Sequence, residues 1–561
     1  MPPPLRFDQP RPLRLSMAWL HTWTGLLLGW LLFAVFASGS LSFFRSEINF
    51  WMHPELHRLR DDARAIAHAR RILEREAPDS RQWTITLPGP RDPTLFVAWR
   101  VDAASPASSP AARPQDRANA PTGGQRRPAH GLRPETRRLA LDPSTGEILK
   151  LREGSGATFL FRFHFQLHGV GWFVGRWIVG VAAMVMLVAL VSGVIIHRNI
   201  FKDFFTFRPN KGKRSWLDAH VLVGVVSLPF HFAITFSGLL LFGALLMPSV
   251  VRSGYSNVAN AANAPSAPNF TMDIRGGRDR FNLAPPSGKP AALAELAPIL
   301  DAAQNEWGGE KAGSVVVSNP GDAAATVEVI QTHGNSLANR GVARRALFDG
   351  VVGVRLETPI EASPSAIVAV WNSLVTLHMG RFATPLQRWL LFLAGVSGTV
   401  MIASGLIVWR VSRFKTLGRS EDAPFGYRLV EVLNVSGIAG WLVALGAYFW
   451  ACRLLPDALA ARGDWEVRVF FLAWAASLIH ATFREHRRAW VEQLRFSGAL
   501  IALLPLINGL TGGAPLFRSV ASGPWQVAGF DICALVAGAL LLFAARKVHQ
   551  AETDDPQITE A

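Results

Sequence analysis

The chain has 561 residues, of which 50% are hydrophobic and only 17% charged, and several of its apolar runs exceed the ~18 residues needed to cross a bilayer, which excludes an ordinary soluble globular protein. The net charge of +16 would suggest a nucleic-acid partner in a soluble chain, but the basic residues cluster just outside the apolar runs, so membrane topology explains them and no nucleic acid is expected. The two cysteines, Cys452 and Cys533, form no CxxC motif and predict no disulfide framework or thiol redox pair.

Eight apolar runs are predicted membrane spans, and they make the chain an all-α polytopic membrane protein. They cover residues 16–45, 172–197, 217–247, 382–409, 427–451, 467–483, 496–513 and 525–545. Every second connection between them is rich in Lys and Arg, as are both terminal segments. By the positive-inside rule these parts, including the N- and C-termini, lie in the cytoplasm, which agrees with an even number of spans.

Two long segments, 46–170 and 248–370, then fall on the outer side of the membrane. Each contains a helix-like stretch followed by strand-like pieces, and they end alike, in "RRLALDPSTGEILKL" and "RRALFDGVVGVRLE". We therefore expect two small α+β outer domains. Residues 103–135 consist of Ala, Ser, Pro, Gly and Arg, a composition that cannot bury a core and predicts a disordered insertion in the first of them.

The predicted division of the chain follows from these segments. It is a cytoplasmic tail and first span (1–45), an outer domain (46–170), the second span (171–198), a basic loop (199–216), the third span (217–247), a second outer domain (248–370), the fourth span (371–410), a four-helix membrane extension (427–547) and a cytoplasmic tail (548–561).

The span–domain–span unit occurs twice. The first and third spans share a histidine, a glycine four residues later and a Ser-Gly pair at 17 and 18 residues: His21, Gly25, Ser38 and Gly39, then His220, Gly224, Ser237 and Gly238. The second and fourth spans share an Arg-Trp pair 16 residues before another Ser-Gly pair, and each is preceded by an outer histidine, His168 or His378. Parallel repeats of this kind are related by an axis along the membrane normal.

This symmetry predicts two histidine pairs, His21 with His220 on the inner side and His168 with His378 on the outer side. Two imidazoles at one level of a helical bundle are the axial ligand set of a bis-histidine haem, and Gly25 and Gly224 would let a flat macrocycle approach the backbone. The alternatives are histidines that only pack, and zinc, which usually takes Cys or carboxylate ligands, of which these spans contain only Asp218. The Ser-Gly pairs are expected to mediate close helix packing.

Three further histidines break the symmetry. His164 lies one turn before His168 and could replace it as a ligand, while His197 and His231 have Trp409 and Leu32 as repeat counterparts. A straight helix from His168 to His197 would place them ~43 Å apart, too far for one direct electron hop. Either the Gly169/Gly171 region folds His168 back toward the membrane, or His231 takes part in an intermediate site.

The chain resembles the PepSY-associated transmembrane proteins over roughly residues 10–412. The matching stretches include "HTWTGLLLGWLLFAVFASG", "FHFQLHGVGWFVGRWIVG", "LVSGVIIH", "SWLDAHVLVGVVSLPFHFAITFSGLLLF" and "RRLALDPSTGEIL". Members of this family include haem-binding reductases of the bacterial inner membrane, which release iron from ferric siderophores as Fe(II) in the periplasm. The resemblance implies PepSY-like periplasmic domains, two bis-histidine haem b groups and an oxidoreductase. It implies haem ligation, or its immediate surroundings, for His21, His168, His197, His220, His231 and His378.

Electrons would come from a cytoplasmic reductase or from membrane quinol, because the chain has no GxGxxG or Walker motif. The alternative function is non-enzymatic: PepSY domains are also associated with restraining peptidases, so the outer domains would bind a peptidase or signalling partner and the histidines would only pack. A transporter is disfavoured, because Asp218, near the start of the third span, is the only acidic residue in the first four spans. The last four spans lie outside the resemblance, and His480 alone suggests no further cofactor site there.

Overall fold

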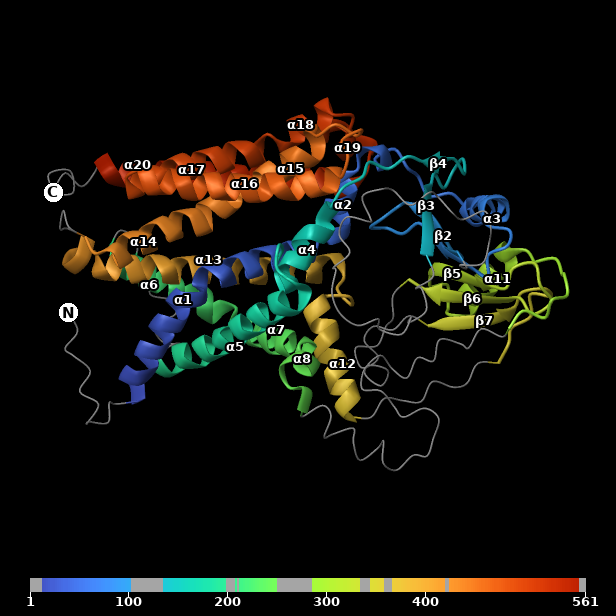
Figure 1. Ribbon diagram of the computed structural model, residues 1–561, viewed down its shortest axis with the longest axis horizontal. Coiled ribbons are helices and arrows are strands. Elements are labelled where there is room, and N and C mark those ends of the chain that lie inside the picture. The colour runs from blue at the N-terminus through green and yellow to red at the C-terminus, as the bar shows by residue number, and fades with distance from the viewer. Residues whose placement is uncertain are drawn as a thin grey trace, which may run out of the picture. The chain divides into compact units, whose positions relative to one another are not determined.

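The computed structural model of the chain describes residues 13–101, 135–197, 207–208, 211–249, 285–332, 344–357, 366–418 and 423–553. All but the last residue of the expected insertion 103–135 lies outside these ranges. The chain divides into two compact units, a helical unit from three chain segments (Met1–His57, Arg152–Ile274 and Ala366–Ala561) and an α+β unit from two (Arg58–Leu151 and Arg275–Ser365). Figure 1 shows the elements of both units.

The helical unit contains seven helices long and apolar enough to cross a membrane, counted over the described residues. They are α1 (Leu13–Ser42), α5 (Trp172–Ile196), α13 (Pro385–Arg413), the run Phe425–Leu454, which includes α14 (Phe425–Asn434) and α15 (Gly440–Leu454), α16 (Arg462–Phe483), the run His486–Leu510 of α17 (His486–Ala502) and α18 (Leu504–Leu510), and α20 (Trp525–Thr553). The chain is therefore a multi-pass membrane protein.

The expected third span, 217–247, is not one straight helix. It consists of α6 (Lys213–Val226) and α7 (Leu228–Leu241), which meet at an angle of 68°, and counting the pair as one span raises the total to eight. Pro229 lies in the first turn of α7. It lacks a backbone N–H and disfavours helical geometry at the preceding residue, which explains the break.

One shorter helix precedes the second span of each repeat: α4 (Gly156–Gln166) lies before α5, and α12 (Ala366–Met379) lies before α13. Between α4 and α5 the chain leaves helical geometry, with a φ of 61° at Leu167 and 80° at Gly169. A single straight helix through His168 is therefore absent. Instead α4 packs on α1 and α5, α1 packs on α5 and α13, and α6 packs on α13 (Figure 1).

The α+β unit has one seven-stranded sheet. In the order β4 (Ile148–Leu149), β3 (Glu135–Leu141), β2 (Leu95–Val101), β1 (Gln82–Thr86), β5 (Ala312–Ser318), β6 (Thr326–Gln331), β7 (Arg345–Asp349), all neighbours are antiparallel. Helices α3 (Ala65–Glu76) and α11 (Leu296–Glu306) share its hydrophobic core.

Both predicted α+β segments are present, but they form one unit and not two separate domains. They join where β1 pairs with β5, for example at Ile85 and Val315, and both of these residues are buried in the common core. Reading outward from this junction, β1, β2 and β3 correspond to β5, β6 and β7, so the duplication seen in the sequence is also present in the sheet. An unpaired edge at either junction strand would expose a row of backbone groups, and pairing the halves removes both edges.

The remaining elements of the helical unit are short. They are α2 (Arg45–Met52), the 3₁₀ turn Pro54–Leu56, α8 (Gly243–Leu246), the π-helical turns Phe414–Gly418 and Val435–Ala439, and α19 (Leu516–Ser522). The predicted seventh span, 496–513, begins ten residues too late, because the first turns of α17 carry Arg487, Arg488 and Glu492. Glu492 is paired with His480 and Arg484, so its charge does not stand alone.

Candidate functional site

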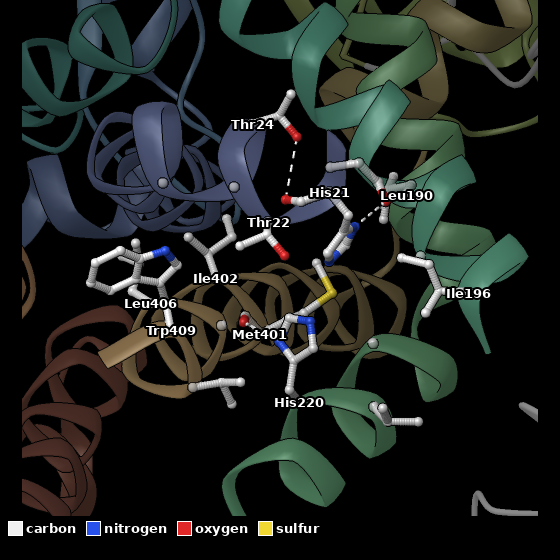
Figure 2. Close-up of a pocket in the computed structure, with 18 of the residues that line it drawn as sticks. His21, Thr22, Thr24, Leu190, Ile196, His220, Met401, Ile402, Leu406 and Trp409 are labelled. Atoms are coloured by element: carbon white, nitrogen blue, oxygen red, sulfur yellow. Dashed lines mark hydrogen bonds between the residues drawn. The ribbon is translucent and has the colours of Figure 1, made fainter. Parts of the chain in front are cut away.

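The inner pair of histidines predicted from the repeat is present. His21 on α1 and His220 on α6 face each other with ring centroids 6.2 Å apart and ring planes inclined at 73°. They line a cavity of about 340 Å³ whose wall also includes Gly25, Gly224 and Met401. Figure 2 shows the two imidazoles approaching from different helices, with Met401 beside them.

Hydrogen bonds fix the orientation of both inner rings. Nδ1 of His21 lies 2.9 Å from the carbonyl oxygen of Ala189 on α5, and Nδ1 of His220 lies 2.8 Å from that of Met401 on α13. A carbonyl oxygen only accepts, so Nδ1 carries the proton and donates it, and Nε2 keeps its lone pair for a ligand. Ala189 and Met401 occupy the same position in the two repeats, so each repeat holds its own histidine in the same way.

The outer pair consists of His164 on α4 and His378 on α12. Their ring centroids are 6.1 Å apart, and the ring planes are inclined at 32°. Nδ1 of His164 donates to the carbonyl oxygen of Val35 at 2.8 Å, and Nδ1 of His378 donates to that of Ile234 at 3.0 Å. These two acceptors are again equivalent, because each lies 14 residues after the inner histidine of its repeat.

The expected pairing of His168 with His378 is not found. His168 follows the end of α4, is exposed, and stacks on Phe471 of α16 with centroids 5.5 Å apart. Matching the two histidines by their distances from Arg176 and Arg388, eight and ten residues, gave the wrong partner, because the chain leaves helical geometry between α4 and α5. The turn at Leu167–Gly171 removes His168 from α4 and leaves His164, the alternative ligand, on the helix face toward α1.

The Ser-Gly pairs predicted to mediate helix packing lie directly against the four paired histidines. A Cβ atom at Gly39 would lie 2.5 Å from the His164 ring, and one at Gly238 would lie 3.0 Å from the His378 ring. The corresponding distances are 3.3 Å between Gly193 and His21 and 3.0 Å between Gly405 and His220. Each ring therefore occupies space that only glycine leaves open, and the repeated Ser-Gly spacing was the signal for it in the sequence.

The serines of these pairs contribute a second contact to three of the rings. Ser192 and Ser404 place their hydroxyl oxygens 3.3 Å from Nδ1 of His21 and His220, and Ser237 places its own 3.0 Å from Nδ1 of His378. No pattern in the sequence pointed to the backbone acceptors Val35 and Ile234, since a carbonyl is present at every residue.

The other two histidines belong to neither pair. His197, at the end of α5, and its repeat counterpart Trp409 both line the inner cavity. His231 is completely buried on α7, where its Nε2 contacts the Ala394 carbonyl and the Ser397 hydroxyl, both at 3.3 Å, and its ring meets Phe36 edge-on. It lies between the depths of the inner and outer pairs and completes neither.

The separation within each pair fits a metal ion bound between two imidazoles. Two metal–nitrogen bonds of about 2 Å and two ring half-widths of about 1 Å add up to a centroid separation of about 6 Å. The described residues contain no group of three or more His, Cys, Asp and Glu side chains that could enclose a metal. Two opposed imidazoles in an apolar bundle therefore suit a metal whose other ligands come from a flat cofactor, as in a bis-histidine haem.

The two pairs lie at different depths along α1. His21 and the Val35 carbonyl that holds His164 are 14 residues apart, which corresponds to about 21 Å of helix. This is half of the ~43 Å expected for a straight helix between His168 and His197, because α4 folds back beside α1. The separation of the two pairs is therefore smaller than the ~30 Å thickness of a hydrocarbon core.

Comparison with known proteins agrees with the architecture. The model of the PepSY-associated TM region matches residues 18–411. The uncharacterized protein PA4219 of Pseudomonas aeruginosa is 28% identical over 403 residues, which cover 66% of this chain and 90% of that protein. The match to the family model spans all four paired histidines and most of both units and ends at residue 411, two residues before the end of α13. The chain belongs to the PepSY-associated transmembrane family.

Proposed function

We propose that the protein binds two haem b groups, one between His21 and His220 and one between His164 and His378, and carries electrons across the inner membrane. At the periplasmic side it would reduce a ferric siderophore or another Fe(III) chelate and release Fe(II). The observation that carries this proposal is the pair of opposed imidazoles, found twice, with each Nδ1 proton donated to a backbone carbonyl.

The chain's own residues bind and tune the cofactor under this proposal. The carbonyl oxygens that accept from Nδ1 fix the ring orientation and raise the basicity of Nε2, which favours the ferric state. The Ser-Gly pairs hold the rings at a fixed height, and the buried surroundings exclude water. The haem, when bound, supplies the one-electron chemistry. Electrons would enter from a cytoplasmic reductase or membrane quinol, because the basic connections favour the cytoplasm as the side nearest the inner pair.

The test is the visible spectrum of the purified protein with and without dithionite, together with haem per chain. We expect two low-spin haems. His21→Ala or His220→Ala should remove one, His164→Ala or His378→Ala should remove the other, and His168→Ala, the matched control four residues after His164, should keep both. A preparation that stays colourless when cells are supplied with haem would contradict the proposal and favour the non-enzymatic role, in which the α+β unit binds a peptidase or signalling partner.

The activity needs a separate measurement. Dithionite-reduced protein should be mixed anaerobically with ferric chelates, and the reoxidation of haem should match the Fe(II) captured by a ferrous-specific chelator. Protein that carries both haems but reoxidises no faster than free haem in the same detergent would limit the function to electron transfer toward another acceptor.

A further inference from the structure

The four-span extension that follows the matched family region has a buried ionic cluster that the proposed function does not use. Arg462 and Glu466 on α16 form an ion pair whose side chains are 0% and 1% exposed. Burying two charges usually costs more than their attraction returns, so such a pair is weak evidence for stability alone. The other hydrogen bonds of Arg462 and Glu466 show which segment this ion pair contacts.

Those bonds lead to the start of α4, the helix that carries His164. The Glu466 carboxylate accepts the backbone N–H of Ser155 at 2.8 Å, and Arg462 donates to the carbonyl oxygen of Glu153 at 2.9 Å. Ser155 also donates its hydroxyl proton to the carbonyl oxygen of Gly463 at 2.7 Å. Ser155 is the N-cap residue of α4 but makes no side-chain cap bond of its own. The carboxylate of another helix therefore satisfies this terminus and complements its dipole.

A second helix of the extension reaches the same point. Tyr448 on α15 is fully buried and donates its hydroxyl proton to the carbonyl oxygen of Gly156 at 2.7 Å. Gly156 has a φ of +56°, and a Cβ atom there would collide with the Asn49 side chain. The first residue of α4 is thus fixed from one side by Tyr448 and from the other by a contact that only glycine allows.

The extension also covers the length of α4. Phe159 packs against Tyr448 and Phe470 with centroids 5.1 and 5.2 Å apart, and Phe163 packs against Phe470 at 6.0 Å. Beyond the helix end, His168 stacks on Phe471. The opposite face of α4 carries His164 to Val35 of α1. An eleven-residue helix is marginal in isolation, so these contacts decide where it lies.

We infer that the extension is a positioning module for the outer histidine pair, and that Glu466 and Tyr448 set the place of His164 by fixing the start of α4. His164 lies nine residues after Ser155, about 13 Å along a helix that moves as one body. A small displacement at the anchored end therefore changes the approach of His164 to His378. This inference rests on the proposed function for its consequence, a tuned outer haem, but the anchoring of α4 can be measured without haem.

The test uses the full-length protein with Glu466→Gln and Tyr448→Phe. Glu466→Gln leaves the Arg462 charge buried and is the stronger change, while Tyr448→Phe removes one hydrogen bond and keeps the fold in case the first variant fails to assemble. The matched controls are Glu492→Gln, which alters a half-buried ion pair on α17, and Tyr427→Phe on α14, both in the same extension and outside the contacts with α4.

Three measurements follow. Hydrogen exchange of the α4 backbone should be about five-fold faster in Tyr448→Phe, the equivalent of one lost hydrogen bond. In haem-free protein, carbethoxylation of His164 should accelerate while that of His53, an internal reference, stays constant. In a His21→Ala background, where only the outer haem remains, both variants should shift its midpoint potential and its EPR signal, and the controls should not.

The outcomes separate the two proposals. Faster exchange in α4 with an unchanged potential and EPR signal would overturn the positioning role, and so would unchanged exchange or equal effects in the controls. A colourless parent protein would contradict the proposed function, while α4 exchange and His164 reactivity would still decide whether the extension positions this histidine.

Discussion

Replacing Gly39 with alanine should weaken the binding of the outer haem and leave that of the inner haem unchanged. The added Cβ atom would lie 2.5 Å from Nδ1 and 2.6 Å from Cε1 of His164, whereas ordinary contacts begin near 3.4 Å. The ring must therefore move by about 1 Å, away from the Val35 carbonyl that accepts its proton at 2.8 Å. Because the start of α4 is anchored, the whole helix cannot shift away from α1 to make room for the added Cβ atom.

The size of the effect follows from three contributions. Overpacking of this kind costs about 1–3 kcal/mol, and loss of the hydrogen bond costs about 1 kcal/mol. Alanine returns about 1 kcal/mol because glycine is a poor helix former. The net cost of about 1–3 kcal/mol corresponds to outer-haem affinity weakened by about 5-fold to 150-fold.

The assay is haem content per chain after gel filtration, combined with the reduced-minus-oxidised spectrum. The glycines beside the other three histidines should give a graded series. An added Cβ atom would lie 3.0 Å from the histidine ring at Gly238 and Gly405 and 3.3 Å from it at Gly193, so Gly193→Ala should weaken haem binding least. Gly529→Ala on α20 is the control, because a Cβ there meets nothing within 4 Å. Loss of the inner haem in Gly39→Ala, or full retention of both haems, would refute the conclusion that Gly39 makes room for the His164 ring.

Three further predictions concern pH and spectroscopy. Burial, with Arg453 nearby, lowers the pKa of His57 to about 3. The imidazole therefore stays neutral in the folded protein, whereas in the unfolded chain it takes up a proton below pH 6.5, so the free energy of unfolding should fall by about 1.4 kcal/mol between pH 7.5 and 5.5. His57→Gln should flatten this pH dependence of thermal stability. Backbone N–H groups of Ala324, Ser287 and Gly288 lower the pKa of the Asp322 carboxyl to about 2, so its stabilisation is complete above pH 3.8 and lost as the pH falls toward 2; Asp322→Asn should lower the melting temperature at pH 7 and remove this acid dependence, and an unchanged melting temperature would contradict it. Because the ring planes are inclined at 73° in the inner pair and 32° in the outer pair, the two ferric centres should give distinct EPR signals, with the larger g anisotropy in the signal lost in His21→Ala.

The sequence predicted those features that depend on periodicity and repetition. Apolar run lengths identified the spans, and the shared offsets of His21 and His220 predicted the inner pair correctly. The position of His164 was not predictable in the same way, because it depends on where α4 ends, and Leu167 gives no sign that it will adopt a positive φ. Likewise, Pro229 marks a break in the third span but not its angle.

The joining of the two α+β segments also escaped prediction. Each half has a complete helix-and-strand pattern of its own, and nothing in the strand of Ile85 or that of Val315 states which edge it will pair with. The buried charges of the extension were not predicted either. Arg462 and Glu466 were placed outside the predicted span 467–483, because charge normally ends a span. Their partners on α4 supply the compensation that a single segment cannot show.

Each repeat builds its own half of both sites and completes neither. His21 is held by Ala189 and His164 by Val35, all from the first repeat, and the second repeat holds His220 and His378 with its own Met401 and Ile234. A symmetric dimer of single repeats would therefore form the same two pairs, but its halves would have to stay identical. Joining the two repeats in one chain allows their sequences to differ. Met401 replaces Ala189 beside the inner pair, His231 replaces Leu32 between the pairs, and the extension anchors α4 at the outer pair. The two halves therefore differ at the inner pair, between the pairs and at the outer pair, which a symmetric dimer could not do.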